Sequence, residues 1–198
     1  MDALRATLTG YAPVDAVEAT DVARAVALLD TGDPWSREHP LHVTASALVV
    51  HPPTRRVLLR WHARMAGWLQ VGGHGDPGES DPWAVALREA AEETGLPDLA
   101  AVTTALERTP VQVVVVSVPP GTGEPAHEHV DVRYVLATAT PDAVRAETSD
   151  APVRWFTVEE ARALVAEPNL RTFLGRVEEI LDRLDPSPHH HHTRGAPR

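Results

Sequence analysis

The chain has 198 residues, 43% of them hydrophobic and 23% charged, so it can bury one substantial core and is too apolar to be disordered throughout. Its 18 basic and 28 acidic residues give a net charge of -10, which would repel a phosphate backbone, so a nucleic-acid partner is not expected. Because the chain has no cysteine, disulfides, thiolate metal sites and cysteine nucleophiles are excluded.

Residues 1–39 are predicted to form an N-terminal helical extension. Apolar residues recur there at roughly helical spacing, and Thr31-Gly32 followed by Pro34 supplies a stop. The first 30 residues lack the basic and apolar stretches of a secretion signal. No apolar run in the chain approaches the ~20 residues needed to cross a bilayer. We therefore expect a cytoplasmic protein without a membrane partner.

Strands are predicted over 42–50 and 56–62, because both segments are rich in β-branched or aliphatic residues. The sequence His51-Pro52-Pro53-Thr54 between them is typical of a hairpin turn. Residues 68–71 are a third, short strand candidate, and a glycine-rich loop is predicted over 72–80.

A helix is predicted to begin after this loop, with Asp81 as N-cap and Pro82 in its first turn. It should run to about Thr94, where Gly95 is suited to a left-handed C-terminal position. Further strands are predicted at 111–118, 129–138 and 153–156, and helices at 158–166 and 170–184. The tail, residues 185–198, combines prolines with the run His189 to His192 and is expected to be disordered; a bland tail is favoured for it, and metal binding by the histidines stays open.

The predicted loop and helix together carry a dense set of acidic residues. At 100° per residue, Glu89, Glu92 and Glu93 fall within an arc of about 100° around the helix axis, so they share one helix face. Each like-charged pair three or four residues apart should destabilise the helix by ~0.2 to 0.5 kcal/mol, so a positive partner is expected. Mg²⁺ prefers such oxygen ligands and also bridges phosphates. Gly73 would let its backbone carbonyl approach the ion, and Arg88 would orient Glu79.

This segment, residues 73–96, resembles the Nudix box, G-x5-E-x7-R-E-U-x-E-E-x-G-U, where U is a bulky aliphatic residue. The matching positions are Gly73, Glu79, Arg88, Glu89, Glu92, Glu93, Gly95 and Leu96. Two departures stand out: eight residues separate Glu79 from Arg88, and Ala90 replaces the larger aliphatic residue. The extra residue falls near Ser80-Asp81-Pro82, where a loop can absorb it before the helix begins.

The resemblance implies an α/β fold, the Nudix α/β/α sandwich with a mixed sheet, over residues 40–184. It implies a pyrophosphohydrolase in which water attacks one phosphorus of a nucleoside diphosphate linked to another group, with Mg²⁺ or Mn²⁺ as cofactor. Glu92 and Glu93 are the expected metal ligands, and Glu89 is either a ligand or the base. Nucleotide sugars, ADP-ribose and modified nucleoside triphosphates all stay open as substrates, and a homodimer is allowed for.

Other residues are candidates for substrate contacts. Four polar residues alternate along one predicted strand and so share a face: His127, His129, Asp131 and Arg133. Nudix enzymes often use a further acid outside the box, for which Glu128 and Glu147 are the candidates. The polar residues His42, Thr44 and Ser46 also share a strand face, and a structural role is favoured for them. Core packing is favoured over base stacking for Trp61 and Trp68.

Three alternatives compete with the interpretation of the chain as an enzyme. A solvated acidic helix face would not need the accompanying glycines and arginine of the box. The isomerase branch of the same fold uses a cysteine, which this chain lacks. A non-catalytic Nudix domain acting as a nucleotide sensor or interaction module stays open, although a pure binding domain need not keep the acids of the box clustered.

Overall fold

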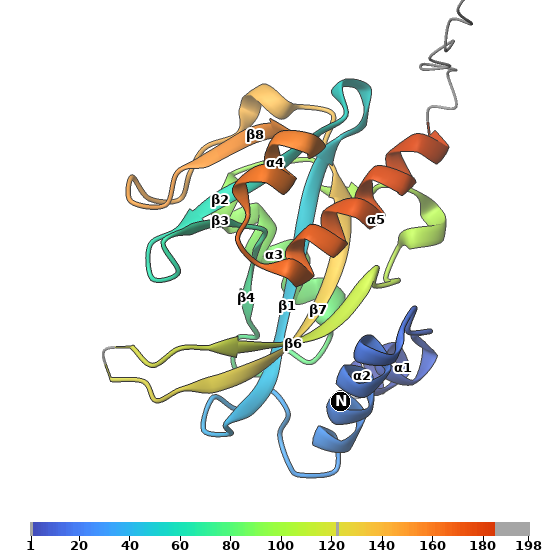
Figure 1. Ribbon diagram of the computed structural model, residues 1–198, viewed down its shortest axis with the longest axis vertical. Helices are drawn as coiled ribbons and strands as arrows, with labels where there is room; N and C mark the ends of the chain where they lie inside the picture. The colour runs from blue at the N-terminus through green and yellow to red at the C-terminus, as the bar shows by residue number, and fades with distance from the viewer. Residues whose placement is uncertain (1, 122, 185–198) are drawn as a thin grey trace, which may run out of the picture.

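The computed structural model describes residues 2–121 and 123–184, so the predicted tail at 185–198 and its histidine run lie outside the described residues. Within these ranges, eight strands form one mixed sheet (Figure 1). The strands are β1 (Leu41–His51), β2 (Arg56–His62), β3 (Gly67–Leu69), β4 (Val71–His74), β5 (Ala100–Ala101), β6 (Gln112–Val118), β7 (His127–Ala137) and β8 (Val153–Thr157). The helices are α1 (Asp2–Gly10), α2 (Ala16–Leu28), α3 (Pro82–Thr94), α4 (Val158–Leu164) and α5 (Pro168–Leu184).

The long strand β1 lies at the centre of the sheet. It runs parallel to β7 and antiparallel to β2 and β4, and the remaining ladders, β2 with β3 and β8 and β7 with β5 and β6, are antiparallel. Helices α1, α2 and α3 share one apolar cluster with one face of the sheet, whereas α4 and α5 share a second cluster with the other face. The predicted sandwich, with its mixed sheet and N-terminal helices, is confirmed.

The N-terminal extension is part of the same core. Leu4 and Leu8 of α1 and Leu28 of α2 are buried in the cluster that contains Val43 of β1 and Val130 of β7. None of the helices in the described ranges is long and apolar enough to cross a membrane. The boundary at residues 39 and 40 stays a prediction.

The predicted glycine-rich loop is partly wrong. The short third strand divides at Gln70 into β3 and β4, and β4 continues through Gly72 and Gly73 to His74. Gly72 pairs with Ser46 of β1 at φ +146°, and a Cβ there would lie 2.4 Å from the Ser46 Cβ. The glycines therefore serve close strand pairing with β1, a contact between distant segments that local turn signals do not encode.

Helix α3 begins and ends as its local sequence predicts. The Asp81 carboxylate accepts a hydrogen bond from the Trp83 N–H at 3.2 Å, and Pro82 occupies the first turn. Gly95 closes the helix at φ +63°, in the left-handed region. The inserted residue of the box thus lies before the helix body, as predicted.

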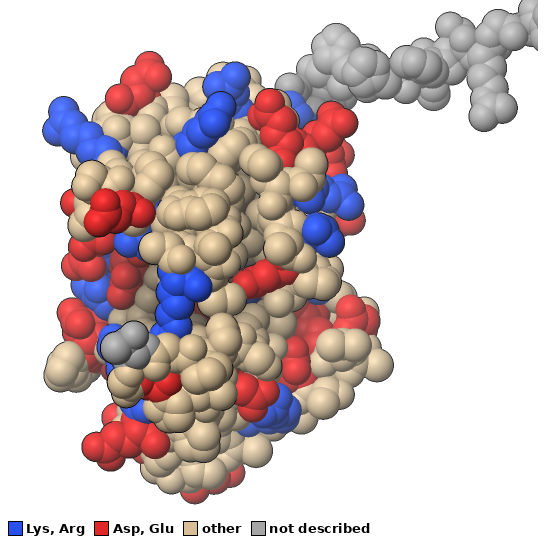
Figure 2. All heavy atoms as spheres, turned by 60° about the vertical axis from the view of Figure 1, so that its left-hand side comes forward, with Lys and Arg blue, Asp and Glu red and all other residues tan. Residues whose placement is uncertain are grey.

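One face of the sheet changes character along β1 and β7. Leu48 and Val50 of β1, with Val135 of β7, lie under α4 and α5, whereas the earlier residues of the same face are polar. This half of the face holds His42, Thr44, Ser46, His129, Asp131 and Arg133. Acidic and basic side chains are interspersed on the molecular face drawn in Figure 2, and they do not gather there into one broad basic patch.

Candidate functional site

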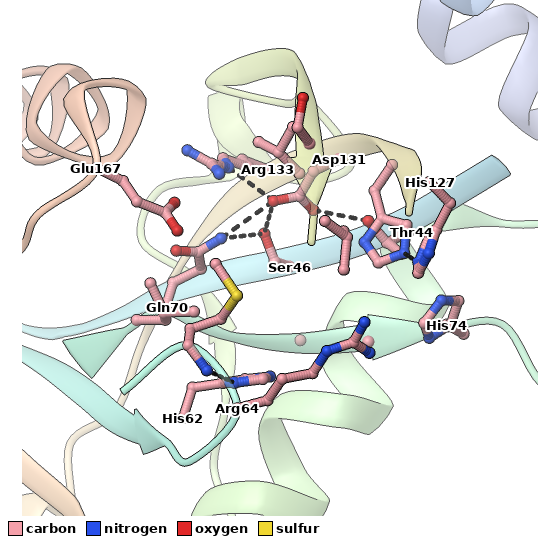
Figure 3. A pocket seen from close by; sticks show the side chains of 18 of the residues that line it. Thr44, Ser46, His62, Arg64, Gln70, His74, His127, Asp131, Arg133 and Glu167 are labelled. Carbon is pink, nitrogen blue, oxygen red and sulfur yellow. Dashed lines mark hydrogen bonds and ion pairs between the residues drawn. The ribbon is translucent and has the colours of Figure 1, made fainter. Parts of the chain in front are cut away.

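A pocket of about 250 Å³ opens on the polar half of the sheet (Figure 3). Its floor comes from β1 and β7 and its rim from the β2–β3 turn, β4 and the β6–β7 hairpin. Arg64 of the turn bridges to the hairpin through Glu124 and the Pro119 carbonyl, which joins the two sides of the rim. Polar groups therefore converge in a concavity that is fixed by strands, which is typical of a small-molecule site.

The Asp131 carboxylate is the centre of the pocket floor. Its oxygens accept hydrogen bonds from Arg133 Nε at 2.7 Å, Ser46 Oγ at 3.0 Å and Gln70 Nε2 at 3.1 Å, and more weakly from Thr44 Oγ1 at 3.3 Å. Because Asp131 is nearly fully buried, these donors replace the water that its charge would need. Thr44 and Ser46 thus hold Asp131 and also line the pocket, so a purely structural role for them stays a prediction.

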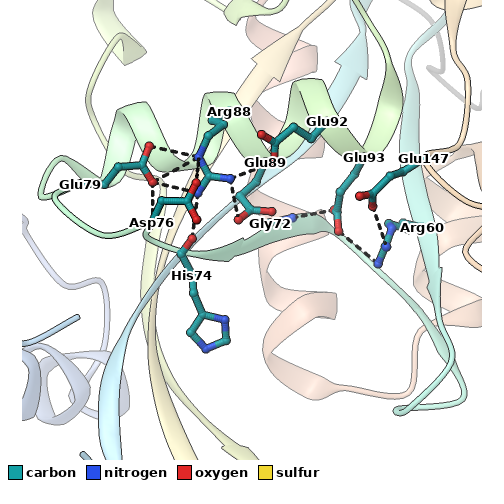
Figure 4. Close-up of polar contacts among 10 residues, drawn as sticks. All are labelled: Arg60, Gly72, His74, Asp76, Glu79, Arg88, Glu89, Glu92, Glu93 and Glu147. Atoms are coloured by element: carbon teal, nitrogen blue, oxygen red, sulfur yellow. Dashed lines mark hydrogen bonds and ion pairs between the residues drawn. The ribbon is translucent and has the colours of Figure 1, made fainter. Parts of the chain in front are cut away.

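On the opposite side of β4, two carboxylates of α3 pack against the strand backbone (Figure 4). The Gly72 N–H donates a hydrogen bond to Glu93 Oε2 at 3.0 Å. A Cβ added at Gly73 would lie 2.6 Å from Glu89 Oε1, so the carboxylate of Glu89 occupies the space that any larger residue would need. The glycine pair thus brings the backbone of β4 into contact with the acids of the box.

Arg88 joins four groups of the box. Its guanidinium donates to Glu79 through Nε at 3.1 Å and Nη2 at 2.8 Å, as the sequence predicted. Nη1 donates to Glu89 at 3.1 Å and to Glu92 at 2.9 Å, and Nη2 also donates to the His74 carbonyl at 2.9 Å. The expected positive partner of the acidic cluster is therefore, in part, Arg88. Glu92 differs from Glu89 and Glu93 in being about half exposed.

A second cation was missed by the sequence reasoning. Arg60 of β2 approaches Glu93 Oε1 at 3.1 Å and Glu147 Oε2 at 3.5 Å. Its position follows from the pairing of β2 with β8 and from where β2 lies in the sheet, and no motif near Arg60 indicates it. Because Arg60 contacts both carboxylates, Glu147 lies beside the box, near Glu93.

The acids next to β4 carry more negative charge than their partners neutralise. Burial raises the pKa of Glu93 to about 7; Glu89 and Glu147 add to this, while Arg60 and the Gly72 N–H oppose it. Burial also raises the pKa of Glu89, assisted by Glu92 and Asp76 and opposed by Arg88. Two adjacent carboxylates, one buried and one partly buried, with raised pKa values fit a divalent cation, which would compensate both charges.

The model of the NUDIX domain family matches residues 40–177, which is most of the chain. The chain belongs to the Nudix family. This confirms the resemblance first seen in residues 73–96. Nudix enzymes generally need a divalent metal ion and act on small nucleotide substrates, which agrees with the acids and the adjacent pocket.

Solved Nudix structures resemble the fold over most of their length. A hydrolase of the NUDIX family from Clostridium perfringens is 25% identical, with a TM-score of 0.54, covering 73% of this chain and 98% of its own. The C. elegans Ap4A hydrolase is 19% identical with a TM-score of 0.56 and coverages of 71% and 97%. The E. coli dihydroneopterin triphosphate pyrophosphohydrolase is 17% identical with a TM-score of 0.52 and coverages of 73% and 97%. The last two likenesses concern the fold alone.

The other predicted residues fall in different surroundings. His127 and His129 line the rim of the pocket, whereas Arg133 is almost fully buried, bonded to Gln112 and Asn169 and stacked over Phe173. This face of β7 therefore lines the pocket, and it is not a solvent-exposed sheet face.

The two candidate acids and the two tryptophans lie outside the Nudix box. Glu128 lies on the other face of β7 from the pocket residues and pairs with Arg24 of α2. Of the two candidate acids, only Glu147 contacts a residue bound to the box. Trp61 and Trp68 pack edge to face with centroids 5.7 Å apart. Trp68 also packs on Phe156 and against the second apolar cluster, whereas half-buried Trp61 belongs to neither cluster, so core packing of Trp61 stays a prediction.

Proposed function

We propose that this Nudix protein hydrolyses a pyrophosphate bond in a nucleoside diphosphate linked to another group, such as a sugar, a ribose or a further phosphate. The observation that carries the proposal is a pair of carboxylates, the buried Glu93 and the partly buried Glu89, packed against the glycine backbone of β4. Their raised pKa values and the fixed Arg88–Glu79 contact support a site that is completed by a cation.

Glu92, Glu93 and the Gly73 carbonyl would hold Mg²⁺ or Mn²⁺, and Glu89 would be a further ligand or the base. A bound ion of this kind stabilises charge that develops on the phosphates and lowers the pKa of water. Arg88 holds Glu79 and the His74 carbonyl in place, so it would act as a positioning residue. Glu147, beside Arg60, is the acid outside the box that we assign to the site.

The pocket would take the nucleoside part of the substrate. It reaches Gly72 and Gly73 from the side of β4 opposite to Glu89, so a phosphate chain leaving the pocket passes the backbone that carries the metal site. His127 and His129 lie on the pocket rim, where substrate contacts were predicted, while Asp131 and Arg133 form its floor. Glu128 pairs with Arg24, so we do not assign it to the metal site or to the pocket.

The experiment is a product-release panel over nucleotide sugars, ADP-ribose, dinucleoside polyphosphates and modified nucleoside triphosphates, with Mg²⁺, with Mn²⁺ and with excess EDTA. We expect a nucleoside monophosphate from at least one class, with the activity abolished by EDTA. If the protein binds a nucleotide but turns none over with either metal ion, the proposed hydrolysis is refuted and a non-catalytic nucleotide sensor is supported. Two further predictions, a homodimer and a cytoplasmic location, would be checked by light scattering and by cell fractionation.

A further inference from the structure

Four histidine rings gather at one end of the sheet, on the face opposite to α3. The register pairs His42 of β1 with His129 of β7 and places His74 of β4 opposite Thr44 of β1. Since side chains on paired strands share a face, His74, His42 and His129 lie side by side. Ring centroids are 4.7 Å apart for His42 and His129, 4.8 Å for His74 and His129, and 5.1 Å for His42 and His74.

The ring nitrogens have the spacing of metal ligands. His42 Nε2 lies 3.0 Å from His74 Nε2, and His127 Nε2 lies 3.1 Å from His129 Nε2. One nitrogen each from His42, His74 and His129 lies within 4.8 Å of the other two. Tetrahedral zinc with bonds of 2.0–2.1 Å separates its nitrogen ligands by about 3.3 Å, so the rings would have to rotate to bring nitrogens that lie up to 4.8 Å apart to that separation.

Backbone carbonyls fix the tautomers of two rings. His42 Nδ1 lies 2.9 Å from the His39 carbonyl, and His127 Nδ1 lies 2.9 Å from the Pro125 carbonyl. A carbonyl can only accept, so each Nδ1 carries the hydrogen and each Nε2 presents a lone pair toward its neighbouring histidine. Metal-binding histidines are commonly oriented by this contact from the other ring nitrogen.

The surroundings favour the neutral form that binds metal. His42 is 2% exposed, and burial lowers the pKa of His42 and lowers that of His129 to about 3. Neutral imidazole suits zinc and its neighbours in the first transition row, whereas Mg²⁺ prefers oxygen. The cluster is therefore chemically distinct from the carboxylates on the other side of β4.

We propose that His42, His74 and His129 bind a zinc-class divalent cation, with His127 nearest to the fourth ligand position. The ion would join β4, β1 and β7 at the rim of the pocket. His74 directly follows Gly73, and its carbonyl accepts a hydrogen bond from Arg88, so the ion would also hold the strand that carries the box backbone. The alternative without a metal ion is two histidine pairs, His42 with His74 and His127 with His129, each joined by an N–H···N hydrogen bond.

The test is calorimetric titration of the full chain with Zn²⁺ in excess Mg²⁺, which occupies the carboxylates. Because consecutive histidines bind metals themselves, the background carries His189→Asn, His190→Asn, His191→Asn and His192→Asn. We expect one Zn²⁺ per chain, a higher melting temperature with Zn²⁺, and a tetrahedral visible spectrum with Co²⁺. His42→Asn, and separately His129→Asn, should weaken Zn²⁺ binding by about 10²-fold or more.

The matched control is His51→Asn at the far end of β1, which should bind Zn²⁺ as the background does. Glu93→Gln should also keep Zn²⁺ affinity, which separates this site from the hydrolytic one. Circular dichroism checks folding, and His74→Asn, at a less buried position, repeats the test if His42→Asn misfolds. No binding by the background chain, or equal affinity in the folded histidine variants, would overturn the proposal whatever the hydrolysis assay shows.

Discussion

Replacing Gly73 by Ala should lower the hydrolysis rate strongly while leaving the fold nearly intact. The added Cβ would lie 2.6, 2.7 and 2.8 Å from Oε1, Cδ and Oε2 of Glu89, whereas ordinary contact begins at 3.4 Å. The carboxylate must therefore retreat by about 0.8 Å, the difference between 3.4 and 2.6 Å. Misplacement of a reacting or ligating group by ~1 Å can cost about 10²-fold in rate. We expect a loss of that size in metal-dependent hydrolysis.

Stability should change little, because the Gly73 backbone does not adopt a positive φ and the displaced atoms are the end of a flexible side chain. Gly72→Ala is the informative contrast, since its Cβ would strike the Ser46 backbone at 2.5 Å and its φ is +146°. That variant should melt at a clearly lower temperature. The assays are product release at saturating Mg²⁺ and thermal unfolding of both variants. A fully active Gly73→Ala enzyme, or one as unstable as Gly72→Ala, would refute the reasoning.

Three further predictions concern stability, measured by denaturant unfolding. Gly175→Ala, whose Cβ meets nothing within 4 Å in α5, should raise the free energy of unfolding by about 0.5 to 1 kcal/mol with unchanged activity, and a loss of stability would contradict this. Arg133→Ala should lower the free energy of unfolding by about 3 to 5 kcal/mol, because the buried Asp131 carboxylate loses its guanidinium partner. The double variant Arg133→Met, Asp131→Asn should recover part of that loss. Burial raises the pKa of Glu18, but hydrogen bonds from Arg176 and Tyr11 outweigh it and leave that pKa below its usual value. Stability from this carboxylate is therefore complete above the unfolded pKa of about 4.3 and is lost as pH falls through the folded pKa. The stability gap between wild type and Glu18→Gln should narrow in acid, and a gap constant from pH 7 to 3 would contradict the assignment.

Much of the fold could be predicted because the signals are local. The start of α3 depends on Asp81 and Pro82, and its end on Gly95, all within a few residues of the boundary. The hairpin of β1 and β2 follows from two apolar runs around a proline-containing turn. The Arg88–Glu79 contact follows from the box itself, since its pattern fixes both partners.

Other features depend on strand order, which no local pattern contains. Arg60 reaches Glu93 only because β2 lies where the end of α3 meets the sheet. The choice between Glu128 and Glu147 requires knowing that α2 brings Arg24 to the former. His42 and His74 meet because β4 pairs with the middle of β1, and the sequence reasoning had no basis for joining them.

The most direct test of the central claim is the hydrolysis rate of Glu93→Gln as a function of Mg²⁺ and Mn²⁺ concentration. The amide keeps the shape of the side chain but loses the charge that would hold the cation, so the rate should fall by about 10²-fold or more. Glu179→Gln, an exposed position on α5, is the matched control and should keep the full rate. Full activity of Glu93→Gln, or of the wild-type protein in excess EDTA, would contradict the account.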